Sequence, residues 1–553
     1  MRAFVLQRLQ EHARAHEEMR CLRDTQVAYL LLRYSLAVRI HYLLRLVGSD
    51  LAPHEEGPQA PIWVHNEQMA LSLAALLVDP TLEADARSAR MRQRLPAWVI
   101  AQAGLPAASG GLTLTLASDV WDAARLAGAS AVRPYLLEHA ADLRLPPSAL
   151  SKISALPYYA GLRAAFDSLL ARSPRARALY PDFTSLLSGT PVAQRDLAEG
   201  VFVSRFLEVV AQQPSMQHRA RVYSAAGQHA GAWLGTFPVT CMSTVRARHF
   251  QLALALRLGC ELPELGTVAG VAQICGGCQG PLDAYGFHPG VCRVGNRVGL
   301  WTLQHDALEA MVAYVIRRAG RQCIVVSRGA GHWFGAAAIG ASGRVRRADL
   351  VLPGHLGMGR HLFLDTAIAD PTSGSALGAQ PSSAACSGVA AGNRAQRKSQ
   401  KYAPLAAGVS SIFIPAVVER YGAQCDQLVG LISQLCGDGD RDRMRHDDVT
   451  FSQSSRTTYM AGMIGLAAVV ADAAMVDSVI GLDVRRDDER AMPGPRMGRG
   501  GGMGEVWVGE PVPGQREVEG RGGAFWYEVP HYSAIRWRYA SPLAFSAGSP
   551  ACV

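Results

Sequence analysis

The chain has 553 residues, enough for roughly two to four domains, and its 49% hydrophobic and 18% charged residues are typical of a globular protein. The net charge of +9 fits a nucleic-acid partner but does not require one. Eleven cysteines, spread from Cys21 to Cys552, argue against a disulfide framework and favour reduced thiols with a metal site.

We expect no segment of the sequence to enter a membrane or to direct secretion. The first ten residues contain two arginines and lack a sustained apolar core. The most apolar early segment, residues 27–47, is interrupted by three arginines. The later apolar run, residues 464–476, is too short to span a bilayer and carries Asp472. The sequence therefore predicts an intracellular protein with no membrane partner.

Residues 1–240 are predicted to be helical throughout. One apolar set recurs at helical spacing, which indicates an ordinary helical core: Val27, Leu30, Leu31, Tyr34 and Val38. Farther along, residues 250–258 are apolar and follow several basic residues. Periodicity cannot separate a strand from a buried helix there, but the alanine and leucine content favours a helix.

Residues 241–300 contain a metal-binding pattern. Its spacing is C-x2-C-x9-H-x3-C, formed by Cys275, Cys278, His288 and Cys292. Zinc prefers four such ligands in a tetrahedron, and the two glycines between the first cysteines permit the tight turn. All four positions are filled by protein ligands, so we expect a structural zinc ion. Cys260 remains an alternative to one of the cysteines.

Residues 301–440 are predicted to form a mixed α/β core, which makes the chain an α+β protein. A helix is expected over 306–319, and strands are expected over 323–327, 347–352, 363–368 and 411–418. A helical extension follows over 441–483. The Gly-, Arg- and Pro-rich tail over 484–553 is predicted to be disordered, and its RGG-like stretches are consistent with RNA binding.

Two aspartates and two lysines in this core predict a phosphodiester-cleaving site. Asp349 and Asp365 on adjacent strands could share one Mg²⁺. Lysine occurs only at Lys152, Lys398 and Lys401, so nearly all of the 55 basic residues are arginine. A lysine that persists in such a composition can serve chemistry that a guanidinium cannot. Either Lys398 or Lys401 could orient the attacking water.

Other residues are predicted to assist this site. Glu309 could supply a third carboxylate, although helical spacing also allows it to face solvent. Tyr402 could hold the lysine or contact a phosphate. A positive surround for a polyanionic substrate is expected from Arg344, Arg346, Arg347, Arg394 and Arg397.

The order of these motifs resembles the C-terminal half of non-LTR retrotransposon polyproteins that carry a restriction-like endonuclease. In that family a CCHC zinc knuckle is followed by a PD-(D/E)XK nuclease whose lysine has moved from the second acidic strand to the next helix. The zinc pattern matches the knuckle, and 347–349 match the first acidic motif, with alanine in the place of proline. Asp365 matches the second acid. Lys398 or Lys401, followed by Tyr402, resembles the displaced lysine and tyrosine.

Weaker similarities extend the resemblance to roughly residues 20–480. His305-Asp306 resembles the His-Asn/Asp pair that opens the first nuclease helix, and 153–157 is similar to an Ile-Asn-Ala-Leu-Pro element. Residues 20–240 resemble the helical region that follows the polymerase domain in related elements. No Tyr/Phe-x-Asp-Asp polymerase motif occurs, so the polymerase core is expected to be absent.

The resemblance implies a metal-dependent DNA endonuclease that nicks target DNA for target-primed reverse transcription in the nucleus. DNA would be its main partner, with element RNA and a separate or upstream reverse transcriptase as further partners. The cofactors would be structural zinc and catalytic magnesium. Two alternatives stay open: a catalytically dead nucleic-acid-binding remnant, and an unstable product of a decayed element.

Overall fold

The structure of the chain is a computed structural model that describes residues 2–46, 61–91, 93–139, 157–188, 190–265, 273–275, 278–292, 297–326, 348–355, 357, 359–437 and 455–491. Three arginines of the predicted positive surround lie outside these residues: Arg344, Arg346 and Arg347. The 153–157 string, except for Pro157, and the predicted tail beyond residue 491 also lie outside them.

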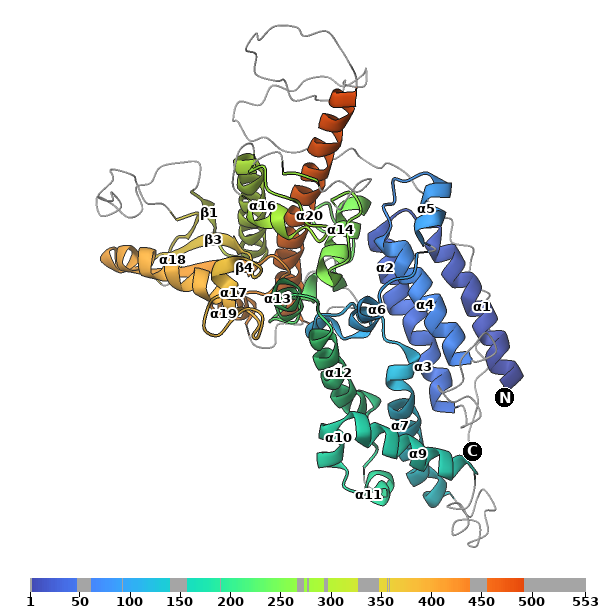
Figure 1. Ribbon diagram of the computed structural model, residues 1–553. Coiled ribbons are helices and arrows are strands. Elements are labelled where there is room, and N and C mark those ends of the chain that lie inside the picture. The colour runs from blue at the N-terminus through green and yellow to red at the C-terminus, as the bar shows by residue number, and fades with distance from the viewer. Residues whose placement is uncertain are drawn as a thin grey trace, which may run out of the picture. The chain divides into compact units, whose positions relative to one another are not determined.

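The N-terminal half is helical, as predicted, and its described residues before Ile274 contain no strand or β-bridge (Figure 1). Its helices are α1 (Arg2–Arg20), α2 (Thr25–Leu31), α3 (Ala37–Leu46), α4 (Pro61–Leu77), α5 (Ala84–Met91), α6 (Ala97–Gly104), α7 (Ala117–Glu138), α9 (Pro157–Arg172), α10 (Pro174–Leu179), α11 (Phe183–Ser188), α12 (Gln194–Ala211), α13 (Met216–Ala225) and α14 (Ala247–Leu258). Short 3₁₀ turns occur at Ala107–Ser109 and Ala232–Gly235.

The predicted apolar stripe at residues 27–38 is only partly correct. A π-helical turn, Leu32–Leu36, joins α2 to α3 without a break, and the extra residue in such a turn shifts which side chains face inward. Leu30 is buried as expected, whereas Leu31 and Val38 are exposed. The helix predicted over 250–258 is confirmed as α14, which ends at Gly259 with a left-handed φ of 64°.

Met1–Met492 form one compact unit. Its C-terminal part contains a small mixed sheet with the strand order β1-β2-β3-β4. Its strands are β1 (Ile324–Val325), β2 (Leu350–Leu352), β3 (Leu362–Ala369) and β4 (Ile412–Glu419). Neighbours pair antiparallel from β1 to β3, and β3 and β4 run parallel. The helices around it are α15 (Phe287–Val291), α16 (Arg297–Arg318), α17 (Gly374–Leu377), α18 (Val389–Gly408), α19 (Asp426–Cys436) and α20 (Arg456–Ala491).

Alternating side chains of the sheet enter two separate apolar cores. Leu350 and Leu364 pack into the core that α16, α19 and α20 share. Val351 and Phe363 belong to a smaller core with Tyr402 of α18. Side chains alternate between the two faces of a strand, so each buried strand contributes to both cores. The α+β class is therefore confirmed.

The predicted domain boundaries are bridged by shared packing. One apolar core takes side chains from α2, from α14, from the cysteine-rich segment and from α20. The last helix continues to Ala491, past residue 484 where the tail was predicted to begin. Two helical stretches, Thr25–Arg45 and Arg456–Ile480, are long and apolar enough to cross a membrane by length and composition. The second of them packs largely inside this unit.

A buried arginine connects the end of the sheet with the start of α15 and with α20. Arg420 follows β4 directly and is 2% exposed. Its Nε donates to Asp472 Oδ2 of α20 over 2.6 Å, and its Nη2 donates to the Gly286 carbonyl before α15 over 2.8 Å. Its Nη1 lies 3.6 Å from Asp370 Oδ2, just beyond β3. The chain packs this side chain so closely that a Cβ atom on Gly290 would meet its guanidinium.

We predict that Arg420→Met lowers the free energy of unfolding by about 3–5 kcal/mol, because it leaves two buried carboxylates without their cation. Urea denaturation of the full chain measures this change. The matched control is Arg175→Met, which breaks an exposed ion pair to Glu199 and should cost less than about 1 kcal/mol. Equal losses in the two variants would show that the Arg420 network does not stabilise the fold.

Candidate metal centre and candidate nuclease site

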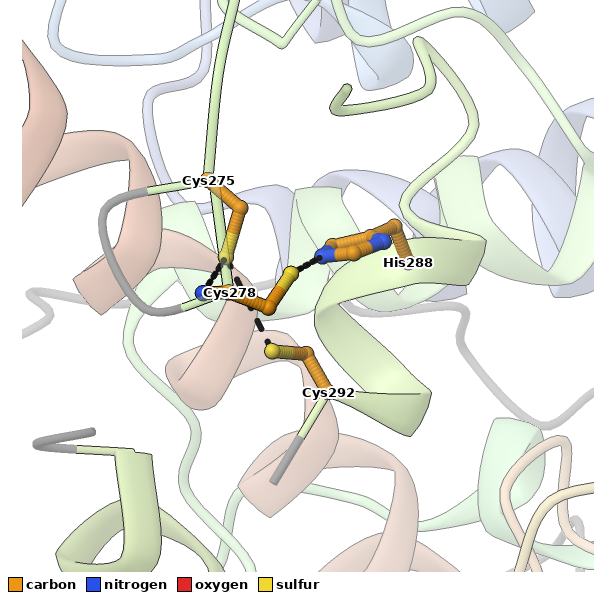
Figure 2. Close-up of side chains that lie close together, drawn as sticks. All are labelled: Cys275, Cys278, His288 and Cys292. Carbon is orange, nitrogen blue, oxygen red and sulfur yellow. Dashed lines mark hydrogen bonds between the residues drawn. The ribbon is translucent and has the colours of Figure 1, made fainter. Parts of the chain in front are cut away.

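The structure brings the four predicted zinc ligands together. Cys275 Sγ lies 3.7 Å from Cys292 Sγ, and Cys278 Sγ lies 3.2 Å from His288 Nε2 (Figure 2). All four candidate ligand atoms lie within 4.8 Å of one another. Zn–S bonds of about 2.3 Å give a tetrahedron whose S–S edges are about 3.8 Å, close to the observed separation. The cluster can hold a metal such as zinc.

Local backbone contacts fix this arrangement. Ile274 and Pro281 form an antiparallel bridge, and Cys275 N donates to the Gly280 carbonyl over 2.8 Å. The Cys275 and Cys278 sulfurs each accept a backbone N–H, over 3.4 Å in both cases. The short turn therefore positions the two sulfurs next to each other.

Cys260 does not join this cluster among the described residues. It follows α14 and lines a different cavity with Glu261 and Tyr285. Burial raises the pKa of its thiol to about 12, which disfavours the thiolate. The geometry thus does not support Cys260 as a ligand, and it supports the four residues of the predicted spacing.

We predict that the Co²⁺-loaded chain shows a thiolate-to-metal absorption band, because three sulfurs would surround the ion. Cys278→Ser should weaken this band strongly, because it removes one of the three sulfurs. The control is Cys386→Ser, an exposed cysteine outside the cluster, which should leave the band unchanged. An identical band in all three proteins would remove these cysteines from metal binding.

The two predicted acidic residues face each other across the sheet. In the register of β2 and β3, Leu350 pairs with Leu364 and Val351 pairs with Phe363. Just before this pairing, Asp349 N donates to the Leu364 carbonyl over 2.9 Å, and Thr366 N donates to Asp349 Oδ2 over 2.6 Å, so Asp349 contacts the backbone on both sides of Asp365. The two carboxylates lie within hydrogen-bonding reach of each other. Asp349 and Asp365 therefore form one carboxylate pair.

The structure distinguishes the two candidate lysines. The ammonium of Lys398 on α18 contacts Asp365 Oδ2 directly. Lys401 Nζ instead donates to the Tyr402 hydroxyl over 2.8 Å and lies 4.4 Å from the centre of that ring. Tyr402 itself is buried against Phe413. The geometry thus brings Lys398 to the carboxylate pair, while Lys401 and Tyr402 contact each other.

A helix on the other side supplies further polar groups. His305 Nε2 of α16 lies 3.2 Å from both Asp349 Oδ2 and Thr366 Oγ1. Glu309, one turn later, is only 4% exposed, so it does not face solvent, and its Oε2 lies 3.9 Å from His305 Nδ1. His305, Asp306 and Glu309 place one ligand atom each within 4.8 Å of one another.

The electrostatics of the pair are asymmetric. Burial and the charge of Asp349 raise the pKa of Asp365 to about 6, against the opposing effect of Lys398. Burial also acts to raise the pKa of Asp349, but the hydrogen bond from His305 brings it below its ordinary value. The same hydrogen bond raises the pKa of His305. Two neighbouring carboxylates with separated pKa values are typical of sites that bind a cation or transfer a proton.

These donors fit a magnesium ion. Mg²⁺ prefers carboxylate oxygens and keeps several waters. Asp349 and Asp365 supply two such groups, and the negative charge of Asp349 contributes, after burial, to the raised pKa of Asp365. A dication beside both would offset that repulsion. Asp370 does not belong to this pair, because it contacts Arg420 and accepts from Thr372.

Two cavities share Trp301, Ile368 and Arg394. The first has a volume of about 310 Å³ and is also lined by His305, Thr366 and Lys398, which contact the carboxylate pair. The second measures about 640 Å³ and extends between α15, through Gly290 and Val291, and α18, through Asn393 and Arg397. Of the predicted basic surround, Arg394 therefore lines both cavities and Arg397 lines the second.

Three residues at this site were not among the predicted site residues. His305 had a signal in the sequence, the His-Asp pair, but nothing there indicated its contact with Asp349. Thr366 donates to Asp349 Oδ2 from both N and Oγ1, over 2.6 and 3.0 Å. Trp301 Nε1 donates to the Cys292 carbonyl over 3.0 Å and so ties α16 to the Cys/His cluster. The last two depend on pairing between segments that the sequence does not reveal.

A scan against protein-family models finds no family that matches the chain, and a search of curated proteins finds no match either.

We predict that Asp365→Asn raises the free energy of unfolding of the chain at pH 8 without Mg²⁺ by on the order of 1–3 kcal/mol, and that its melting temperature rises with it. An acid whose folded pKa is raised stabilises fully below its unfolded value of 3.8 and loses that contribution as pH rises through about 6. Asparagine does not ionise and removes this loss, so the melting temperatures of the parent and the variant should converge below pH 4. Thermal unfolding at the two pH values measures the difference. A variant that is less stable at pH 8 would show that the Lys398 contact outweighs the carboxylate repulsion.

Proposed function

We propose that this protein is a metal-dependent DNA endonuclease, the nuclease portion of a non-LTR retrotransposon polyprotein, which nicks target DNA for target-primed reverse transcription. The observation that carries the proposal is the convergence of three separate segments: Asp349 before β2, Asp365 in β3 and Lys398 in α18. The motif order that resembles the retrotransposon family supports the same assignment.

Each residue has a role that follows from its contacts. Asp349 and Asp365 would hold Mg²⁺, which when bound polarises the scissile phosphate and lowers the pKa of its bound water. Lys398, beside Asp365, would orient the attacking water and stabilise negative charge that develops on the phosphate oxygens. Attack on phosphorus forms one P–O bond and breaks another, so the DNA strand is nicked. His305 positions Asp349 through their hydrogen bond.

We assign substrate binding to the larger of the two cavities, which Arg394 and Arg397 of α18 line. Guanidinium groups neutralise phosphates along a nucleic-acid backbone. The same cavity reaches Gly290 and Val291, next to Cys292, so the cysteine-rich segment would contact the same DNA strand. Element RNA and a separate or upstream reverse transcriptase would be further partners, a nuclear location follows from a chromosomal DNA target, and no membrane takes part.

The test is nicking of supercoiled plasmid by the full chain in Mg²⁺. Asp365→Ala and Lys398→Ala should each slow nicking by about 100-fold or more, because each removes a charge from the reacting phosphate. Lys401→Ala is the matched control: it removes a lysine three residues away that contacts Tyr402, and its rate should stay within about threefold of the parent.

Other outcomes would change the assignment. Loss of nicking in Lys401→Ala alone would exchange the roles of the two lysines. Unchanged rates in Asp365→Ala would remove the carboxylate pair from the mechanism. Salt-sensitive DNA binding without cleavage in any divalent ion would favour the catalytically dead nucleic-acid-binding remnant.

A further inference from the structure

Three histidines occupy core positions where two N-terminal helices pack together. Helices α1 and α4 lie side by side at the N-terminal end (Figure 1). The buried stripe of α1 contains Leu9, His12, His16 and Met19, and that of α4 contains Ile62, His65, Met69 and Leu73. The spacing of three and four residues in each stripe is that of one helix face. The histidines thus replace apolar residues at the centre of this interface.

The three rings form one compact cluster. His12, His16 and His65 are 7%, 0% and 1% exposed. The rings of His12 and His65 stack at 5.7 Å between centroids with an interplanar angle of 3°, and the ring of His16 meets that of His12 edge-on at 4.9 Å. One ring nitrogen from each lies within 4.8 Å of the others. Zn–N bonds of about 2.1 Å need N–N separations of about 3.4 Å, so the rings would have to draw closer together around the ion.

Several of the ring nitrogens are buried without a hydrogen-bond partner among the described residues. They are His12 Nε2, His16 Nε2 and both nitrogens of His65. A buried polar atom without a partner costs free energy, and such atoms are usually avoided or satisfied. A ligand that takes one lone pair from each ring would satisfy three of these four atoms, while the other nitrogen of His65 would keep its N–H, so a ligand explains the cluster better than apolar packing does.

The outer contacts orient the rings for such a ligand. His16 Nδ1 is hydrogen-bonded to Ser72 Oγ of α4 over 2.8 Å, and the backbone of Leu36 hydrogen-bonds the ring of His12. A partner on one ring nitrogen fixes the tautomer and directs the other nitrogen toward a metal, as in most histidine metal sites. Both contacts leave Nε2 without a hydrogen-bond partner among the described residues.

The cluster supplies ligands of suitable chemistry. All three rings are buried, and imidazole nitrogens are borderline ligands that suit zinc.

We propose that His12, His16 and His65 form a second metal site that binds a zinc ion and ties α1 to α4. This site is independent of the cysteine-rich cluster and of the proposed nuclease. Three nitrogen ligands leave one coordination position for water or a further group. The ion would bridge two helices whose packing otherwise brings unsatisfied nitrogens together, so its expected effect is structural.

The test uses the full chain, loaded with zinc and freed of excess metal. The parent should retain about two zinc ions per chain and His65→Leu about one, because leucine removes a ligand from this site alone. Leucine also suits an apolar interface, so the variant is expected to fold. The matched control is His249→Leu, which removes a partly buried histidine of α14 that pairs with Asp477 and should leave the zinc content unchanged.

A second measurement needs no variant. X-ray absorption at the zinc edge of the parent should show more nitrogen than sulfur scatterers, because a three-histidine site is averaged with a site of three sulfurs and one nitrogen. A spectrum of three sulfurs and one nitrogen would overturn the proposal, even if His65→Leu did not fold. Equal zinc content in the parent and a folded His65→Leu would also overturn it.

Discussion

The buried contact between Arg420 and Asp472 is the interaction on which the C-terminal part of this unit depends. A charged pair with exposures of 1% and 2% is tolerated only when its remaining hydrogen-bonding groups are engaged. Arg420 meets most of this condition: its Nη2 donates to the Gly286 carbonyl, whereas its Nη1 has, among the described residues, only the 3.6 Å ion pair with Asp370. One side chain thus joins the end of the sheet, the start of α15 and the last helix. The carboxylate pair draws on this arrangement, because His305 and Lys398 lie on α16 and α18, which pack against α20 and β4.

The carboxylate pair itself works against stability. Like charges that lie close together are destabilising, and burial adds to that cost. The structure compensates with groups that each contact one aspartate: His305 and Thr366 reach Asp349, and Lys398 reaches Asp365. The compensation is incomplete, since the pKa of Asp365 remains raised. A site that retains such repulsion is expected where a cation or a substrate completes the charge balance.

Features that depend on residues close together in the sequence could be predicted, whereas contacts between distant residues could not. The four strands and the zinc ligands followed from short apolar runs and from a fixed Cys/His spacing. The same information could not separate Lys398 from Lys401, because that choice depends on which face of α18 meets β3. It also missed the Arg420–Asp472 pair, whose members are separated by 52 positions along the chain, and it assigned Glu309 partly to solvent. A π-helical turn cannot be read from periodicity, so the stripe around Val38 was misplaced.

The most direct test of the central claim is to locate a divalent ion in crystals of the full chain grown with Mn²⁺ and a DNA duplex. Mn²⁺ takes the oxygen ligands of Mg²⁺ and scatters anomalously at an accessible wavelength. The account predicts an anomalous peak that contacts carboxylate oxygens of both Asp349 and Asp365, with a phosphate of the duplex on the ion's open side. A duplex bound along Arg394 and Arg397 with no ion between the two aspartates would contradict it.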